Sequence, residues 1–205
     1  EYDKLFEESG VLREKTWQEF LDTSLALGNC PPLRGDNVVI ITNGGGAGLL
    51  AADHFERLGM PLKELKDISP DLRENIRNYM PAFGSPLNPV DISGTATSDM
   101  YGGALKTAYR DEHVDGILIS VCPTAVTDVE AITETVINIH RQYKNLGKPF
   151  IMECQGGNEC REAIMKLRDK GIPAYSTPEQ AVNAMVALRR YSHIMNKKEK
   201  LIKNI

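Results

Sequence analysis

Short apolar runs alternate along this chain with longer segments in which apolar residues recur at helical spacing. An apolar run of about four to eight residues is typical of a buried strand, whereas helices are longer. The pattern predicts strands at residues 38–41, 62–65, 89–92, 114–121, 149–152 and 174–175. It predicts helices at residues 46–58, 69–79, 97–110, 128–143, 158–169 and from 178 past 191.

The alternation of strands and helices predicts how these elements pack. Successive strand–helix–strand units give a parallel sheet with helices on both faces. We therefore expect an α/β fold: a flavodoxin-like doubly wound parallel sheet in three layers, with the strands at 38–41 and 116–121 in its centre. Ligands of such sheets lie beyond the carboxyl ends of the strands, so functional residues are expected in the strand-to-helix loops.

A helical preface precedes the alternating part. Gly10 predicts the end of a short first helix, and Thr16 with Glu19 forms a capping box for a second one. Pro31 and Pro32 then end the helical pattern. These signals divide the chain into a helical preface and linker from a preceding domain at 1–34, a flavodoxin-like domain at 35–195 and a C-terminal tail at 196–205.

Composition and charge exclude several classes of partner. The formal net charge of the 205 residues is −4, which gives no electrostatic footprint for a nucleic acid. No run of eighteen apolar residues predicts a membrane span, and the first residues do not resemble a signal peptide. We therefore expect a cytoplasmic protein that binds neither nucleic acid nor membrane.

The cysteines and histidines show no pattern of a metal site or a catalytic set. Cys30, Cys122, Cys154 and Cys160 have no CxxC spacing, which favours reduced thiols over disulfides or a bound metal. The four histidines are more typical of surface or packing positions than of catalysts, and no metal-ligand cluster stands out: His54, His113, His140, His193.

The strongest chemical signal is the loop after the first strand. It reads TNGGGAG over residues 42–48 and leads into a helix. Three successive glycines, Gly44, Gly45 and Gly46, allow positive φ angles and expose backbone N–H groups. The positive end of the following helix favours an anion there. The loop lacks the Lys-Ser/Thr of a P-loop, which argues against triphosphate hydrolysis in it. A tight turn that only packs helix on strand is the alternative.

Three further loops should lie at the same edge of the sheet. Residues 122–128 place hydroxyls and small residues, including Thr124, Ala125 and Val126, where a helix is expected to start with free N–H groups. Asp91 ends the extended segment 89–92, and Gly156 with Gly157 forms another glycine turn. We predict substrate or phosphate binding by Asn43, Gly44, Gly45, Gly46, Thr124, Ala125 and Val126, with Asp91, Gly156 and Gly157 as possible support.

Three segments carry a resemblance to a known family. Residues 38–53 read VVIITNGGGAGLLAAD, residues 88–94 read NPVDISG, and residues 171–175 read GIPAY, followed by PEQA at 178–181. In this order they resemble the NDP-forming acyl-CoA synthetases, whose best-known members are the ADP-forming acetyl-CoA synthetases, here of alpha-subunit type. The resemblance covers essentially the whole chain. It implies that residues 35–195 are the second ligase domain of such an enzyme. The chain is also similar, more distantly, to the C-terminal domain of the succinyl-CoA synthetase beta subunit.

The resemblance implies an activity for the full protein, an acid–thiol ligase. Such an enzyme interconverts acyl-CoA, ADP and phosphate with a carboxylic acid, ATP and CoA, through an acyl phosphate and a phosphohistidine, and is expected to use ATP/ADP, Mg²⁺ and CoA. The implied partners are the CoA-binding and first ligase domains of the same protein, an ATP-grasp domain or subunit, and a small carboxylic acid or acyl phosphate. The family's phosphohistidine lies in a Ser-His-Thr-Gly motif of the preceding domain. This chain has no such motif, so we expect no catalytic residue in it.

The same resemblance implies roles for individual positions. In the succinate enzyme, an asparagine before the glycine turn and a later loop bind the acid, and these positions match Asn43 and residues 124–126. The match departs at Pro123 and Thr124, where the succinate enzyme has glycines, so the acid is left open. Two other functions remain: a ligase-like regulatory or binding domain of a protein lysine acetyltransferase, and a stand-alone binder of small anions.

Overall fold

The core of the protein is a five-stranded sheet in which every strand pairing is parallel. The computed structural model describes residues 2–203. Its strands are β1 (Val38–Thr42), β2 (Val90–Asp91), β3 (Gly116–Val121), β4 (Phe150–Cys154) and β5 (Ala174–Tyr175), in the spatial order β2-β1-β3-β4-β5. The predicted α/β class and the interior positions of β1 and β3 are confirmed.

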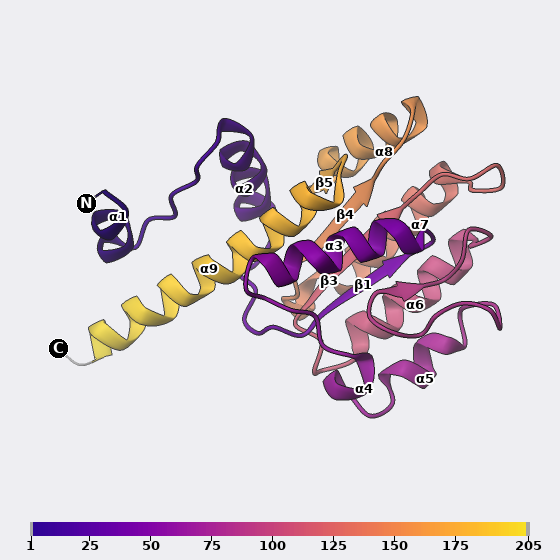
Figure 1. The fold of residues 1–205 in the computed structure, drawn as a ribbon, viewed down its shortest axis with the longest axis horizontal. Helices are drawn as coiled ribbons and strands as arrows, with labels where there is room; N and C mark the ends of the chain where they lie inside the picture. Colours follow the sequence, from indigo (N-terminus) through magenta and orange to yellow (C-terminus); the bar gives the residue numbers. More distant parts are fainter. Residues whose placement is uncertain (1, 204–205) are drawn as a thin grey trace.

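Helices connect the strands and cover both faces of the sheet (Figure 1). Thr16 and Glu19 form the predicted capping box, and Thr97 caps the helix before β3. None of the helices in residues 2–203 combines the length and apolar character that crossing a bilayer requires. The helices are α1 (Tyr2–Ser9), α2 (Trp17–Asn29), α3 (Gly45–Arg57), α4 (Leu65–Ile68), α5 (Leu72–Arg77), α6 (Ser98–Arg110), α7 (Val129–Tyr143), α8 (Asn158–Asp169) and α9 (Pro178–Lys203), with a 3₁₀ turn, η1 (Lys144–Leu146).

The hydrophobic core has two parts, one on each face of the sheet. Side chains alternate along a strand, so Val38 and Ile40 of β1 face one side while Val39 and Ile41 face the other. The first side is covered by α3 and α9, and the second by α4 to α8. All five residues of β1 are buried, as expected of a strand with helices on both faces.

Two predicted elements differ in the region between α3 and β2. The strand predicted at 62–65 is wrong, because this segment leads into α4, where Leu65 is fully buried. The helix predicted at 69–79 is shorter, since α5 begins only after Asp71. Short apolar runs fit a buried helical turn as well as a strand, so their pattern alone does not separate the two.

A side chain completes the outer edge of β1. The two-residue strand β2 pairs only with the end of β1, at Ile41 and Thr42. Farther back, the Asn88 side chain donates to the carbonyl of Val38 at 2.8 Å and accepts from the amide of Ile40 at 3.1 Å. The Asn88 amide thus takes the place of a strand residue and satisfies the edge of the sheet.

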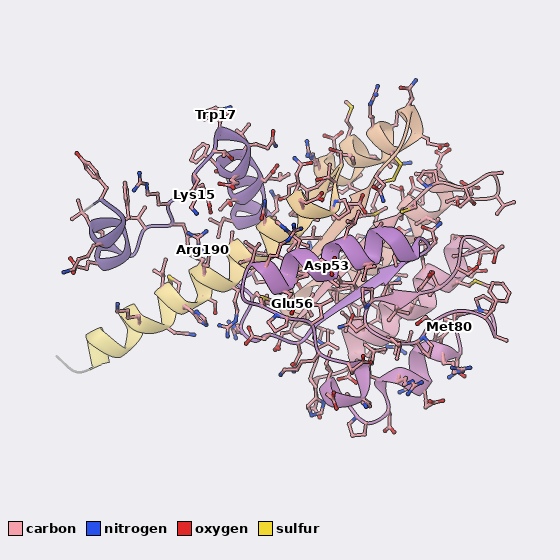
Figure 2. The ribbon with its side chains drawn as sticks, in the orientation of Figure 1. Lys15, Trp17, Asp53, Glu56, Met80 and Arg190 are labelled. Atoms are coloured by element: carbon pink, nitrogen blue, oxygen red, sulfur yellow. A yellow bond between two sulfur atoms is a disulfide. The ribbon has the colours of Figure 1, made fainter. Side chains whose placement is uncertain are left out.

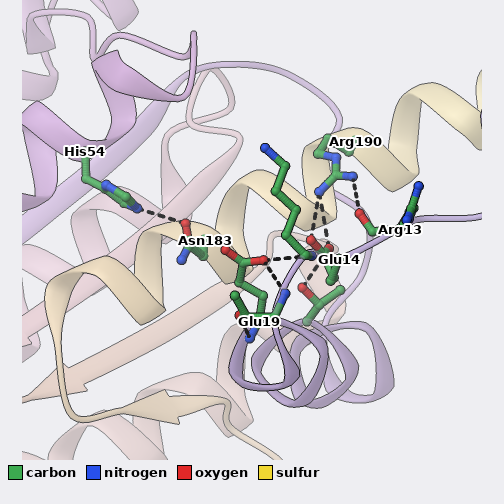
Figure 3. A network of polar contacts seen from close by, with 9 residues as sticks. Arg13, Glu14, Glu19, His54, Asn183 and Arg190 are labelled. Carbon is green, nitrogen blue, oxygen red and sulfur yellow. Dashed lines mark hydrogen bonds and ion pairs between the residues drawn. The ribbon is translucent and has the colours of Figure 1, made fainter. Parts of the chain in front are cut away.

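The N-terminal helical segment is attached to the sheet domain through α9. α2 packs along α9, and the Tyr175 hydroxyl donates to the Asp22 carbonyl at 2.7 Å. Figure 3 shows Arg190 of α9 bound to the Glu14 carboxylate and the Arg13 carbonyl just before α2. The far side of α2 is open, and Trp17 there is 73% exposed and points away from the domain (Figure 2).

The cysteines do not all follow the prediction of reduced thiols. Cys154 and Cys160 are joined by a disulfide between the end of β4 and the first turn of α8. Cys30 and Cys122 are free thiols. The sequence spacing did not indicate this bond, because the two sulfurs meet only when the turn after β4 folds back on itself.

The centre of the sheet offers a direct test of the packing. We expect Leu118→Ala, at a fully buried site in β3, to lower the free energy of unfolding by about 2–5 kcal/mol through lost burial and the cavity left behind. The matched control Leu49→Ala, on the exposed side of α3, should change it by less than about 0.5 kcal/mol. Urea denaturation followed by circular dichroism measures both, and equal losses would contradict this arrangement of the core.

Candidate functional site

Four loops with candidate binding residues meet at one edge of the sheet. In the strand register, Thr42 pairs with both Asp91 and Ser120, and Ser120 pairs with Glu153. The strands therefore end side by side, and the loops after β1, β2, β3 and β4 all leave from the same edge. The structure brings together the loops that the sequence pattern placed there.

The glycine turn after β1 works differently from the expectation. None of Gly44, Gly45 and Gly46 has a positive φ angle, so that part of the prediction is wrong. Glycine is required by close approach instead. A Cβ on Gly44 would lie 2.6 Å from the Cys122 sulfur, and one on Gly45 would lie 2.8 Å from a carboxylate oxygen of Asp91. The space beside Gly46 is open.

The start of α3 leaves backbone donors available to a ligand. Gly44 is the N-cap and has no side chain to accept from the first turn. Gly45 and Gly46 are exposed, and within the described residues their N–H groups have no hydrogen-bond acceptor. The first N–H groups of a helix have no partner inside the helix, and they carry its partial positive charge. This is the geometry of an anion site.

Asn43 joins the glycine turn to the loop after β3. Its side chain is buried; the amide nitrogen donates to the Cys122 carbonyl at 2.9 Å, and the amide oxygen accepts from the Cys122 N–H at 2.8 Å. A weaker contact of 3.4 Å reaches the Thr127 hydroxyl. The Asn43 amide is therefore already engaged by the protein, and it fixes the distance between the two loops.

The loop after β3 is a closed turn. Thr124 and Thr127 hydroxyls lie 2.9 Å apart, and the Thr124 hydroxyl also donates to the Gly94 carbonyl. The N-terminus of α7 is capped in part, because the Asp128 carboxylate accepts from its third N–H, that of Ala131. Of the predicted residues in this loop, Ala125 and Val126 lie exposed at its tip.

The other two loops support this arrangement. Asp91 accepts from the Ser93 N–H at 2.8 Å, which closes the turn after β2 and leaves its second oxygen beside Gly45. After β4, Gly157 is the N-cap of α8 and also lacks a side-chain acceptor, while Gly156 packs against Pro123. Gly157 therefore offers a second uncapped helix start at this edge.

A buried carboxyl group lies beneath the loops, and sequence analysis missed it. Glu153 of β4 is fully buried, accepts from the Ser120 hydroxyl at 2.5 Å, and has one oxygen without a hydrogen-bond partner in residues 2–203. Burial raises its pKa to about 7, because an ionised carboxylate loses its hydration there. A glutamate inside an apolar strand is the signal that could have identified it.

The Cys122 thiol lies between the glycine turn and the loop after β4. Its sulfur packs against Gly44 and accepts from the Gln155 side-chain amide at 3.0 Å. Burial raises the pKa of the Cys122 thiol, so it is protonated at neutral pH. No group of three or more His, Cys, Asp or Glu side chains in residues 2–203 is arranged as a metal site.

The fold and this edge together define a class: a doubly wound α/β domain with an uncapped helix start after its first strand. The sequence profile of the Ligase-CoA domain matches residues 38–197. This chain belongs to the Ligase-CoA domain family.

Similar proteins are subunits or domains of CoA ligases. The chain is 43% identical to the alpha subunit of acetate–CoA ligase [ADP-forming] I from Pyrococcus furiosus, over 93% of this chain and 40% of that subunit. It superimposes with a TM-score of 0.90 on acetyl-coenzyme A synthetase 1 (dinucleotide forming) of Ca. Korarchaeum cryptofilum in complex with phosphate and ADP, at 33% identity, over 97% of this chain and 42% of that one.

A weaker similarity links the chain to succinate enzymes. It is 28% identical to the beta subunit of succinate–CoA ligase [GDP-forming] from Thermus thermophilus, over 74% of this chain and 33% of that one. Both resemblances drawn from the sequence motifs are confirmed. The chain spans about two fifths of the length of the acetate–CoA ligase subunit that it matches. These relatives are ligases and give no support to the acetyltransferase alternative.

The buried Glu153 predicts a specific pH dependence of stability. Its pKa is about 7 in the folded state and near its ordinary 4.5 in the unfolded state, so the folded state holds the proton more tightly. Stability from this group is fully present below pH 4.5 and is lost as the pH rises through about 7. The total loss is on the order of 3 kcal/mol.

Glu153→Gln removes this titration. We expect the stability difference, variant minus wild type, to rise in favour of the variant between pH 4.5 and about 7 and then to level off. Urea denaturation at several pH values measures it, and because the two proteins share their other titrating groups, those groups cancel in the difference. Parallel stability curves across this range would refute the role of Glu153.

Proposed function

We propose that this chain is the second ligase domain of an ADP-forming acyl-CoA synthetase, and that it binds the carboxylic acid or phosphoryl group at its glycine turn. The full protein would interconvert acyl-CoA, ADP and phosphate with the acid, ATP and CoA. The single observation that carries the binding role is the uncapped, exposed start of α3 at Gly45 and Gly46. The similarity to acetate–CoA ligase [ADP-forming] I and to acetyl-coenzyme A synthetase 1 supports the activity.

Each predicted residue has a proposed part in this site. Gly44, Gly45 and Gly46 supply backbone donors and the close approach that a ligand needs. Asn43 positions the turn against the loop after β3, where Thr124, Ala125 and Val126 form the opposite wall. Asp91, Gly156 and Gly157 support the outer turns. The role is electrostatic stabilisation, not proton transfer.

The division of the chain is also a proposal. Residues 1–34 would connect to a preceding domain, residues 35–195 form the ligase domain, and residues 196–205 are a tail that begins within α9. The CoA-binding and first ligase domains, an ATP-grasp domain or subunit, and Mg²⁺ are expected partners of the full protein. A cytoplasmic location stays a prediction.

The strength of the site follows from its parts. A helix start contributes on the order of 0.3–1 kcal/mol to binding a negative charge when exposed, and up to about 2 when partly buried. One or two such termini give roughly millimolar affinity at best. The domain would therefore position an anion that other parts of the full enzyme help to hold.

Anion binding can be measured on this chain directly. We expect phosphate, acetyl phosphate or acetate to shift the amide resonances of residues 43–48, with roughly millimolar affinity. Gly45→Val should abolish the shifts, because its Cβ would press on Asp91 and its methyl groups would cover the exposed turn. Gly28→Ala, where an added Cβ meets open space, is the matched control and should bind as the wild type does. If none of the three anions moves these resonances, the site is wrong.

The activity requires a separate test. We expect the purified 205-residue chain to form no acyl-CoA from acetate, ATP and CoA, because it lacks a Ser-His-Thr-Gly motif to carry phosphate. The full-length gene product should form acyl-CoA and release ADP. Turnover by the chain alone, in preparations free of contaminating ligase, would overturn this assignment. Acetylation of protein lysines by the full-length product, without acyl-CoA formation, would favour the acetyltransferase alternative.

A further inference from the structure

A cavity of about 490 Å³ opens at the end of the sheet opposite the glycine turn. It lies where β4 begins, between the end of α7, η1, the segment after α2 and the turn between α8 and β5. We call it the basic cavity, defined by six of its lining residues: Cys30, His140, Arg141, Lys144, Lys148 and Lys170. Pro31, Ile137 and Ile172 add apolar wall.

The charge of the basic cavity is of one sign. Arg141, Lys144, Lys148 and Lys170 line it, and no carboxylate does. Among the described residues, Lys144 and Lys170 have no ion pair, and Arg141 donates only to the Asn138 side-chain oxygen at 3.2 Å. Three of the four cations, Arg141, Lys144 and Lys170, thus line a concave place without a carboxylate partner among the described residues, which raises the local concentration of anions.

Lys148 is held differently from the other three cations. Its ammonium group donates to the carbonyls of Ala108 and Asp111. Burial lowers its pKa, while the carboxylates of Asp111 and Asp115 act in the opposite direction. The Lys148 ammonium group is therefore held by carbonyls outside the cavity lining, whereas Lys144 and Lys170 are exposed residues of that lining.

The negative C-terminal ends of nearby helices neutralise only part of the positive charge in the basic cavity. α7 and α8 both end at the basic cavity, and a helix C-terminus carries about −0.5 of an elementary charge. Two such ends supply about −1, against about +3 from Arg141, Lys144 and Lys170 alone, with Lys148 partly compensated by Asp111 and Asp115. The cavity keeps a strong positive excess after this compensation.

His140 adds a neutral hydrogen-bond donor. Its Nδ1 lies 2.8 Å from the hydroxyl of the buried Tyr109. Burial lowers the pKa of His140 to about 4, and the neighbouring Lys144 adds to this, so the ring is neutral at pH 7. Burial also raises the pKa of Tyr109, so its hydroxyl keeps its proton. In the tautomer in which Tyr109 donates to Nδ1, the ring proton is on Nε2 and can donate to an anion.

We propose that the basic cavity binds a multiply charged phosphate compound, with a diphosphate group as its recognised part. Its volume falls in the range of about 300–1,000 Å³ typical of small-molecule sites. Lysine and arginine side chains are the usual ligands of phosphate oxygens, and the three without a carboxylate partner, Arg141, Lys144 and Lys170, suit the charge of a diphosphate. The proposal is independent of the glycine turn, since the two sites lie at opposite ends of the strands.

Inorganic pyrophosphate is the probe for this site. Titration into the 205-residue chain should give saturable shifts of the amide resonances at 140–148 and 170–172, and the affinity should fall as salt is added. Orthophosphate should bind more weakly. ADP, tested in parallel, shows whether a nucleoside diphosphate binds better than the free diphosphate does. Tighter binding of either compound identifies the source of the diphosphate.

Charge removal completes the experiment. The double variant Lys144→Gln, Lys170→Gln should lower the pyrophosphate affinity by about tenfold or more. Lys66→Gln with Lys106→Gln, two exposed lysines outside the cavity, is the matched control and should leave it unchanged. Gly45→Val should also leave it unchanged, which separates this site from the glycine turn. No saturable shift at 140–148 and 170–172, or equal affinity of the two double variants, would overturn the proposal.

Discussion

The pair of hydrogen bonds between the Asn43 side chain and the Cys122 backbone sets the geometry of the candidate site. The parallel ladder between β1 and β3 stops at Thr42 and Ser120, and beyond it the two chains would separate into loops. The Asn43 amide presents a donor and an acceptor as a peptide group does, so it extends the pairing by one step. Because Asn43 and Cys122 each follow a strand of the sheet, these two hydrogen bonds fix the position of the glycine turn relative to residues 124–127.

Close packing next to these hydrogen bonds explains why glycines follow Asn43. The Cys122 side chain packs against the turn, and its sulfur occupies the place that a side chain would take at Gly44. Asp91 does the same at Gly45 from the other neighbouring strand. The turn therefore packs between the ends of β2 and β3, and its other side faces solvent. The glycines leave room for the side chains of Cys122 and Asp91. Because Gly44 has no side chain to cap α3, the first N–H groups of this helix stay exposed.

The sequence predicted the fold well where its pattern is long and periodic, as in α7 and α8, whose bounds at Val129–Tyr143 and Asn158–Asp169 agree with prediction to within a residue. It failed at short segments such as 62–65, where a buried turn of helix and an edge strand share the same apolar spacing. The position of the candidate loops at one edge of the sheet was accessible, because glycines and hydroxyls mark strand ends. The contacts made by these loops could not be predicted from the sequence. The hydrogen bonds of Asn43 with Cys122 and of Ser120 with Glu153 depend on which strands become neighbours, and the Asp128 cap depends on where α7 begins.

The charges at this edge of the sheet limit how strongly the domain alone would hold an anion. An anion at the α3 start meets a partial charge of about +0.5, but the carboxylate of Asp91 lies beside Gly45, and that of Asp128 caps α7 in the facing loop. These two carboxylates offset part of the attraction of one helix end, and Glu153 would add a third negative charge if it lost its proton. The raised pKa of Glu153 keeps this carboxyl group largely neutral below about pH 7.

This edge of the sheet therefore has the shape of an anion site but lacks part of the positive charge that tight binding needs. Positive charge supplied from outside this chain, by a neighbouring domain or a cation bound with the ligand, would complete it. That requirement is consistent with the chain spanning about two fifths of the ligase subunit that it matches.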